Sequence, residues 1–265
     1  MISNIKQYAK NSIFRIIWNN KGVFPYFQHK VFFPKNSIIF HRAVTEGIYE
    51  KDNVKIINSL IKENTTVFDI GANIGLIAIP ILSRFENINV VSVEPSPNSF
   101  PFLTKTHQNS SLKDRWTLIN KAASNEKGTI NFQLAKPNNA AYESILNTSR
   151  VNFVDSVEVE CTTIDDIWEN RGKPEVSFIK IDIEGADLLA LRGGINCIAN
   201  CKPKILIEWN KVNVIPFNLS NQDLLDFTKK IGYTIYASAY FTKCESISEL
   251  NIFSAIDENF LLVPN

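Results

Sequence analysis

Short apolar runs alternate with helically spaced segments from about residue 65 to the end of the chain. The apolar runs predict strands at 66–70, 89–94, 116–120, 176–182 and 204–208, with closing strands at 233–236 and 259–263. The helical spacings predict helices at 73–85, at 98–108, from 185 to about 191, and at 222–231. Strands that alternate with helices are connected by right-handed crossovers, so we expect an α/β fold with a mostly parallel sheet covered on both faces.

One region interrupts this alternation. Residues 129–134 and 157–161 alternate between apolar and polar positions, as half-buried strands do. The polar and small residues between them, 135–156, form a connection longer than most loops. Such a segment is either a binding loop or lid, or an ordinary surface excursion.

The first 60 residues differ from the remainder and form a separate lead-in segment. Residues 31–33 and 37–40, with a turn at 34–36, predict a hairpin, and residues 52–61 have helical spacing. We therefore divide the chain into an N-terminal helical and hairpin segment, 1–60, and one large domain, 61–265.

The first twenty residues also have helical spacing, with basic residues between the apolar ones, at Ile5, Tyr8, Ser12, Ile13 and Ile16. We favour a helix packed on the main domain over a helix lying on a membrane surface. No secretory signal is visible and no run approaches the ~20 apolar residues that span a bilayer, so we expect no transmembrane segment.

Composition narrows the function classes. The net charge of +1 over 265 residues gives no reason to expect a nucleic-acid partner. The cysteines contain no CxxC pair and have no neighbouring histidine: Cys161, Cys197, Cys201 and Cys244. Reduced thiols in a cytoplasmic protein are therefore expected, and a zinc site is not.

The segment after the first strand of the domain carries candidate cofactor chemistry. Gly71 allows a sharp turn and a close ligand approach, and Gly75 allows close packing before the helix. Asp69, at the strand end, would repel a pyrophosphate and attract a cationic amine or sulfonium. Glu94, at the end of the next strand, could accept hydrogen bonds from both hydroxyls of an adenosine ribose. The alternatives are a turn-stabilising acid for Asp69 and an exposed strand end for Glu94.

Five segments of the chain match a known pattern: VFDIGANIG at 67–75, VVSVEPSPNSF at 90–100, TTIDDI at 162–167, FIKIDIEGAD at 178–187 and PKILIEWN at 203–210. They give the chain a resemblance to the FkbM family of S-adenosylmethionine-dependent methyltransferases. This resemblance implies a class I methyltransferase (Rossmann-like) fold over 61–265, with seven strands of which the last is antiparallel. It also implies O-methylation of sugars or natural products, with S-adenosylmethionine as cofactor. The predicted cofactor-binding residues are Asp69, Gly71, Ala72, Asn73, Gly75, Glu94, Ala122 and Asp182.

Two further points follow from the resemblance. Residues 46–50 resemble a short acidic stretch before the family's first strand, so Glu50 could face the cofactor, or it could be a surface glutamate. The stretch after the third strand, 120–124, has no acid, although many class I methyltransferases hold the adenine amino group with one there. Adenine would then be bound by backbone groups or by Asn120.

Methyl transfer to a hydroxyl needs alignment of the acceptor oxygen and removal of its proton as it attacks. None of the three histidines is well placed for this, and the candidates are acids at strand ends: Asp182, Glu184 and Glu208. Lys180 could neutralise a buried acid or form a structural ion pair with Glu208. Two nearby carboxylates do not establish a metal site, and we predict none.

Two rival functions share parts of this pattern. A nicotinamide-dependent or other nucleotide-cofactor oxidoreductase would use the same turn, but residues 71–75 lack the G-x-G-x-x-G spacing. A non-catalytic, methyltransferase-like binding module is the alternative outside enzymes, and the retained acids argue against it. The expected partner is a small-molecule or glycan acceptor, whose identity the sequence does not give; it gives no oligomeric state either.

Overall fold

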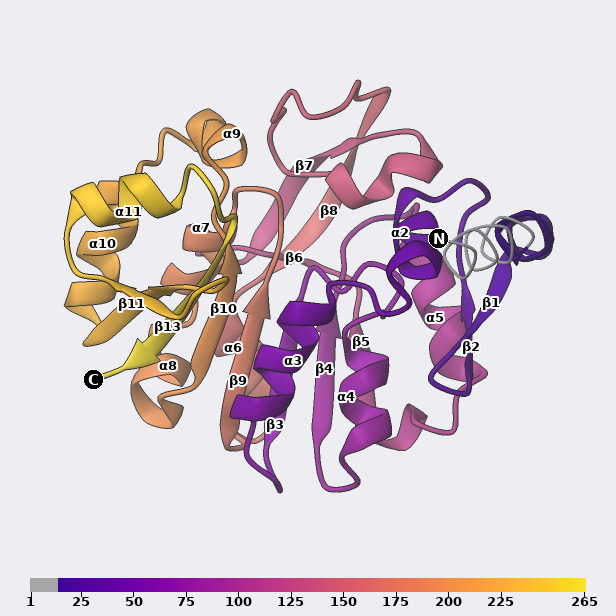
Figure 1. The fold of residues 1–265 in the computed structure, drawn as a ribbon, viewed down its shortest axis with the longest axis horizontal. Helices are drawn as coiled ribbons and strands as arrows, with labels where there is room; N and C mark the ends of the chain where they lie inside the picture. The colour runs from indigo at the N-terminus through magenta and orange to yellow at the C-terminus, as the bar shows by residue number, and fades with distance from the viewer. Residues whose placement is uncertain (1–13) are drawn as a thin grey trace, which may run out of the picture.

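A central sheet of eight strands forms the middle layer of the computed structural model, which describes residues 14–265 (Figure 1). In sheet order these strands are β12 (Thr242–Cys244), β11 (Tyr233–Ala237), β13 (Asn259–Pro264), β10 (Lys204–Glu208), β9 (Val176–Ile181), β3 (Thr66–Ile70), β4 (Asn89–Val93) and β5 (Trp116–Ile119). The five strands from β10 to β5 are parallel, and β13 is antiparallel to both of its neighbours. The expected fold class is confirmed, with one strand beyond the expected seven, because β12 extends the edge beside β11.

The strands at the centre of the sheet are buried along their whole length. Every residue of β3 and of β9 is buried, which explains their continuous apolar runs. Successive side chains point to opposite faces, so Val67 and Phe68 join different apolar clusters. Two charged residues interrupt these runs, Asp69 in β3 and Lys180 in β9, and both mark the functional end of the sheet.

Helices cover both faces of the sheet (Figure 1). One face packs against α6 (Ile164–Asn170), α7 (Asp187–Arg192), α8 (Ile195–Cys201), α10 (Asn221–Lys230) and α11 (Ile247–Phe253). The other packs against α2 (Ile38–Glu46), α3 (Lys51–Leu60), α4 (Ala78–Arg84) and α5 (Phe100–Gln108). Short helical turns complete the set: η1 (Lys113–Arg115), η2 (Pro137–Tyr142), α9 (Lys211–Val214) and η3 (Ile215–Phe217).

Two predicted helices begin later than expected. The helix predicted from residue 73 begins at Ala78, because Asn73 and Gly75 have positive φ angles of 49° and 91°. The helix predicted from Gly185 begins at Asp187, because Glu184 and Gly185 also have positive φ. Both delays leave irregular backbone at the carboxyl ends of strands, where a ligand can approach it.

The predicted hairpin at 31–40 is wrong in position. The hairpin strands are β1 (Val23–Tyr26) and β2 (His29–Phe32), which are joined through Phe27 and Gln28. Residue Ser37 instead caps α2 by accepting a hydrogen bond from the Phe40 amide. The apolar side chains of β1, β2, α2 and α3 join the cluster on one face of the sheet, so the described part of the lead-in segment packs on the domain.

The helix predicted for the first twenty residues lies mostly outside the described residues, since Ile5, Tyr8, Ser12 and Ile13 precede residue 14. Residues 14–21 are helical, and Ile16 is exposed. Within residues 14–265, the helices are all too short or too polar to cross a bilayer.

A second, three-stranded sheet lies above the carboxyl ends of the central strands (Figure 1). It consists of β6 (Ala122–Ala123), β8 (Asp155–Thr162) and β7 (Gly128–Leu134), and it confirms the two strands predicted around the long polar segment. That segment, residues 135–154, contains η2 and is fastened by a bridge between Gln133 and Ser144. We call it the β7–β8 segment.

Candidate active site

A pocket opens at the carboxyl ends of β3, β4, β9 and β10, below the β7–β8 segment. Its floor includes the turn after β3, and its walls include α2 and the segment between α2 and α3. Of the predicted site residues it is lined by Gly71, Ala72, Asn73, Glu94, Asp182, Glu184 and Glu208. The topology thus brings together acids that lie up to 114 positions apart in the chain.

Close backbone packing explains the glycine that follows β3. A Cβ atom on Gly71 would lie 1.9 Å from the carbonyl oxygen of Asp182, and its φ is +85°. The amides of Gly71 and Ala72 both donate to the Val93 carbonyl, at 2.9 and 3.1 Å. The turn is therefore held between the ends of β4 and β9, and Gly71 lets both approach it.

Glu94 is a buried carboxylate that also shapes the floor of the pocket. Its Oε2 accepts the Asn73 amide at 2.8 Å, and its Oε1 accepts the Ser96 amide at 2.8 Å. Burial raises the pKa of Glu94 to about 7, although both amides act to lower it. A carboxylate has room for about two hydrogen bonds on each oxygen, so each oxygen keeps an acceptor position.

A cluster of charged side chains around Lys180 lines one part of the pocket. The Lys180 Nζ is 3.0 Å from Asp182 Oδ2 and 3.8 Å from Glu50 Oε2. Burial lowers the pKa of Lys180, but the charges of Asp182, Glu50 and Asp69 outweigh burial and raise it. Asp69 is fully buried and does not line the pocket, and burial raises its pKa to about 6 against the effect of Lys180. The positive charge of Lys180 therefore offsets the negative charges of carboxylates from three different parts of the fold.

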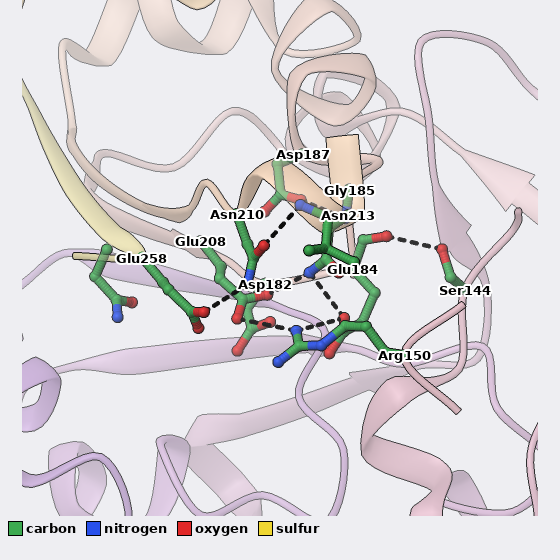
Figure 2. A network of polar contacts seen from close by, with 12 residues as sticks. Ser144, Arg150, Asp182, Glu184, Gly185, Asp187, Glu208, Asn210, Asn213 and Glu258 are labelled. Carbon is green, nitrogen blue, oxygen red and sulfur yellow. Dashed lines mark hydrogen bonds and ion pairs between the residues drawn. The ribbon is translucent and has the colours of Figure 1, made fainter. Parts of the chain in front are cut away.

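Three carboxyl groups and an arginine meet at the ends of β9 and β10 (Figure 2). Arg150 Nη1 lies 2.9 Å from Glu184 Oε2 and 3.4 Å from Glu208 Oε1. Asn213 Nδ2 donates to the same two acids, at 2.8 and 3.1 Å. Carboxylate oxygens of Asp182, Glu184 and Glu208 all lie within 4.8 Å of one another, so their charges interact strongly.

The three acids divide into one that ionises readily and two that do not. Burial would raise the pKa of Asp182, but Lys180, a hydrogen bond from Glu208 and the Arg150 charge lower it. Burial and the charge of Asp182 raise the pKa of Glu184 to about 8. Burial and both neighbouring acids raise the pKa of Glu208 well above its usual range. Burial and neighbouring negative charge therefore oppose the ionisation of Glu184 and Glu208 more than that of Asp182.

A family model described as the methyltransferase FkbM domain matches residues 69–235, more than half of the chain. The chain belongs to the FkbM methyltransferase family. The matched region begins at Asp69, in β3, and ends in β11, so it contains the pocket floor and all three strand-end acids.

Two curated proteins and a solved structure are similar to the chain. A hexuronic acid methyltransferase from Haloferax volcanii, AglP, is 26% identical over 150 residues, 56% of this chain and 58% of that protein. A 2-O-methyltransferase from Sinorhizobium fredii, NoeI, is 26% identical over 170 residues, 58% of this chain and 69% of that protein. A crystal structure of methyltransferase FkbM from Methylobacillus flagellatus shares the fold, with a TM-score of 0.51 at 18% identity. That match covers 85% of this chain and 52% of the other.

The pocket of this FkbM chain has a donor and acceptor set suited to S-adenosylmethionine. Glu94 offers carboxylate oxygens to a ribose, and behind the pocket lining Asp69 keeps a buried Oδ1 without a partner among residues 14–265. The acids around Lys180 provide negative charge for a cationic sulfonium and ammonium. These residues therefore fit the cofactor that the family implies.

The remaining predicted residues lie outside the pocket lining. Gly75 packs beneath it, where a Cβ would lie 2.7 Å from the Trp116 ring. Ala122 is buried in β6 and pairs with Cys161. Asn120 uses its amide on the Glu94 carbonyl, at 2.8 Å. Ala122 and Asn120 thus support the neighbouring backbone, and their contact with a cofactor stays a prediction.

Several pocket residues escaped the sequence analysis. The β7–β8 segment contributes Tyr142, Glu143 and Arg150, and no periodicity or motif in residues 135–156 singles them out. Glu143 accepts hydrogen bonds from Ser96 Oγ and, at 2.7 Å, from Asn98 Nδ2, which ties the segment to the turn after β4. The segment is therefore a wall of the pocket.

Proposed function

We propose that this chain transfers a methyl group from S-adenosylmethionine to a hydroxyl group of a sugar or glycan. The observation that carries the proposal is that one pocket holds both the ribose-binding type of acid, Glu94, and an ionised strand-end acid, Asp182. The printed functions of two relatives, a hexuronic acid methyltransferase and a 2-O-methyltransferase, support a sugar acceptor.

The residues divide into a cofactor group and an acceptor group. Glu94 and the turn of residues 71–73 would hold the adenosine, with Glu94 accepting the ribose hydroxyls. The bound cofactor supplies an electrophilic methyl group on a sulfonium. Asp182 would accept the proton of the acceptor hydroxyl as the new carbon–oxygen bond forms. The attacking oxygen becomes strongly acidic as its bond to the methyl carbon forms, so a carboxylate of low pKa can take its proton.

The acid cluster favours methylation of a hydroxyl oxygen of the acceptor over methylation of a carboxylate oxygen. An ionised Asp182 attracts a hydroxyl donor by hydrogen bonding and repels an anionic nucleophile. The β7–β8 segment and α9 cover the cluster, with Ser144 Oγ donating to the Glu184 carbonyl at 2.9 Å (Figure 2). This cover would reduce competition from water.

The first prediction concerns cofactor choice. The purified chain should bind S-adenosylmethionine and S-adenosylhomocysteine and should not bind NAD, because Asp69 before the turn and Asp182 beside it disfavour a pyrophosphate. Calorimetric titration with each ligand measures this. Binding of NAD without binding of S-adenosylhomocysteine would replace the proposal with the oxidoreductase alternative. A chain that binds the cofactor but methylates no acceptor would instead be a binding module.

The second prediction concerns Glu94. Glu94→Ala should weaken S-adenosylhomocysteine binding at least about tenfold, because each charge-assisted hydrogen bond contributes about 1.5–3 kcal/mol. Glu94→Gln keeps the shape and should show an intermediate loss. Since the pKa of Glu94 is about 7, wild-type affinity should also fall as the pH drops from 8 to 6, and this fall should vanish in Glu94→Gln. Unchanged affinity in both variants, with a lowered melting temperature in Glu94→Ala, would make Glu94 only a turn-stabilising residue.

A further inference from the structure

Arg150 is the cation that the β7–β8 segment brings to the acid cluster, and its orientation is fixed. Nη1 donates to Glu184 at 2.9 Å and approaches Glu208 at 3.4 Å. The guanidinium carbon lies 4.9 Å from the centre of the Tyr142 ring, in a cation–π contact. Figure 2 shows the guanidinium group lying beside these acids, close to Asp182. A guanidinium held at one nitrogen and one face is pre-organised for a further ligand.

The rest of the guanidinium group is open to the pocket. Arg150 lines the pocket, and its Nε and Nη2 make no hydrogen bond with any residue from 14 to 265. About a fifth of the Arg150 side chain is accessible. An arginine donates in a planar fork, so these free donors match two oxygens of one oxyanion.

The two cations at the cluster, Arg150 and Lys180, pair with different acids. Asp182 pairs directly with Lys180, at 3.0 Å. Arg150 pairs with Glu184 and Glu208. Burial raises the pKa of both acids, to about 8 for Glu184, while the charges of Glu184, Glu208 and Glu258 raise the pKa of Arg150. Glu258 also lines this wall, and its Oε1 accepts a hydrogen bond from Asn210.

We propose that the open side of Arg150 binds the carboxylate of a uronic acid, so that the acceptor of the proposed methyltransferase is an acidic sugar. The inference rests on the proposed function and assigns it a specificity residue. Glu208 contacts Arg150 and lies within 4.8 Å of Asp182, so the carboxylate site and the hydroxyl site adjoin. The carboxylate of the sugar would bind Arg150, while a hydroxyl of the same sugar would donate a hydrogen bond to Asp182.

Binding to the enzyme saturated with S-adenosylhomocysteine tests this without turnover. The ligands are glucuronate and galacturonate, the matching neutral hexoses, and the hexose 6-phosphates and 6-sulfates, measured by ligand-observed NMR titration. The wild type should bind at least one uronate about tenfold or more tightly than its neutral counterpart. Arg150→Gln should abolish this preference, and Arg150→Lys should keep part of it, because lysine keeps the charge but not the fork. Arg171→Gln, at an exposed arginine outside the pocket lining, should change nothing.

Each other result decides against the assignment. Equal binding of uronates and neutral hexoses overturns it, as does a uronate preference that survives in Arg150→Gln. If a phosphate or sulfate ester binds more tightly than the uronates, the assignment of a carboxylate as the anion bound by Arg150 is overturned. If Arg150→Gln does not fold, Arg150→Lys takes its place. An unchanged preference for uronates in Arg150→Lys would overturn binding of the carboxylate by the two free nitrogens of Arg150. Uronate binding that depends on Arg150, in a chain that methylates no sugar, would leave the site standing and refute the proposed function.

Discussion

Replacement of Asp182 by asparagine is expected to lower turnover about 100- to 10,000-fold at saturating cofactor and acceptor. Asp182 is the strand-end acid whose pKa is held low, by Lys180, a hydrogen bond from Glu208 and Arg150. It is therefore ionised at neutral pH and can take the acceptor proton, whereas asparagine cannot. Steady-state kinetics with an acceptor in hand measure the effect. Glu184→Gln is the matched control, and it should lose less because Glu184 is mostly protonated at pH 7.

The dependence of turnover on pH separates these two acids. With Asp182 as the base, turnover should be nearly flat from pH 6 to 9, because its pKa lies below this range. With Glu184 as the base, turnover should rise about tenfold per pH unit up to about pH 8 and then level off, because only the ionised form accepts a proton. A rising profile that disappears in Glu184→Gln would transfer the role to Glu184. Weaker S-adenosylhomocysteine binding in Asp182→Asn with normal saturated turnover would make Asp182 a cofactor contact.

A divalent cation offers the other route to an activated hydroxyl. Asp182, Glu184 and Glu208 present oxygen atoms within 4.8 Å of one another, and hard cations prefer such ligands. Lys180 and Arg150 already pair with these acids, so we expect turnover to be insensitive to a chelator. Activity lost with a chelator and restored by magnesium would instead favour Lewis-acid activation.

The parts of the site that could be predicted are those that short local patterns, strand ends and turns, place in the fold. Asp69, Gly71 and Glu94 occupy strand ends and a turn, and a parallel sheet brings its carboxyl strand ends to one edge. The strand Val176–Ile181 is apolar apart from Lys180 and one serine, so its place in the centre of the sheet and the acids after it followed from pattern alone. Local chemistry and topology agree in this half of the pocket.

The parts that could not be predicted depend on contacts between distant segments. Arg150 belongs to a polar connection, and only the fold of that connection over β9 and β10 brings its side chain to Glu184. Glu50 lies at the N-terminus of α3 and lines the pocket beside Lys180, and only the resemblance to the family, not the local pattern, points to it. The hairpin was misplaced because Phe27 and Gln28 adopt positive φ angles of 46° and 67°, which turn rules assign to glycine or asparagine.

Replacement of Lys180 by methionine is expected to destabilise the fold by about 3–5 kcal/mol at pH 8, because it leaves buried carboxylates unpaired. Lys180 is 3% exposed and balances Asp182, Glu50 and Asp69. Chemical denaturation measures the free energy of unfolding. Lys127→Met is the control: its ammonium pairs with Asp166 on the surface, and its loss should change stability by about 0.5 kcal/mol or less.

The pH dependence of this loss identifies its cause. Without Lys180, the pKa of Asp69, already about 6, should rise further, and that of Asp182 should rise with it. Groups whose pKa is higher in the folded state bind more protons there, so they favour folding as the pH falls through the raised pKa. The deficit of Lys180→Met relative to the wild type should therefore shrink from pH 8 to pH 5. Adding Asp69→Asn should recover part of the stability at pH 8. A deficit that stays constant with pH and is not relieved by Asp69→Asn would mean that Lys180 acts by packing, through its alkyl chain, and not by balancing charge.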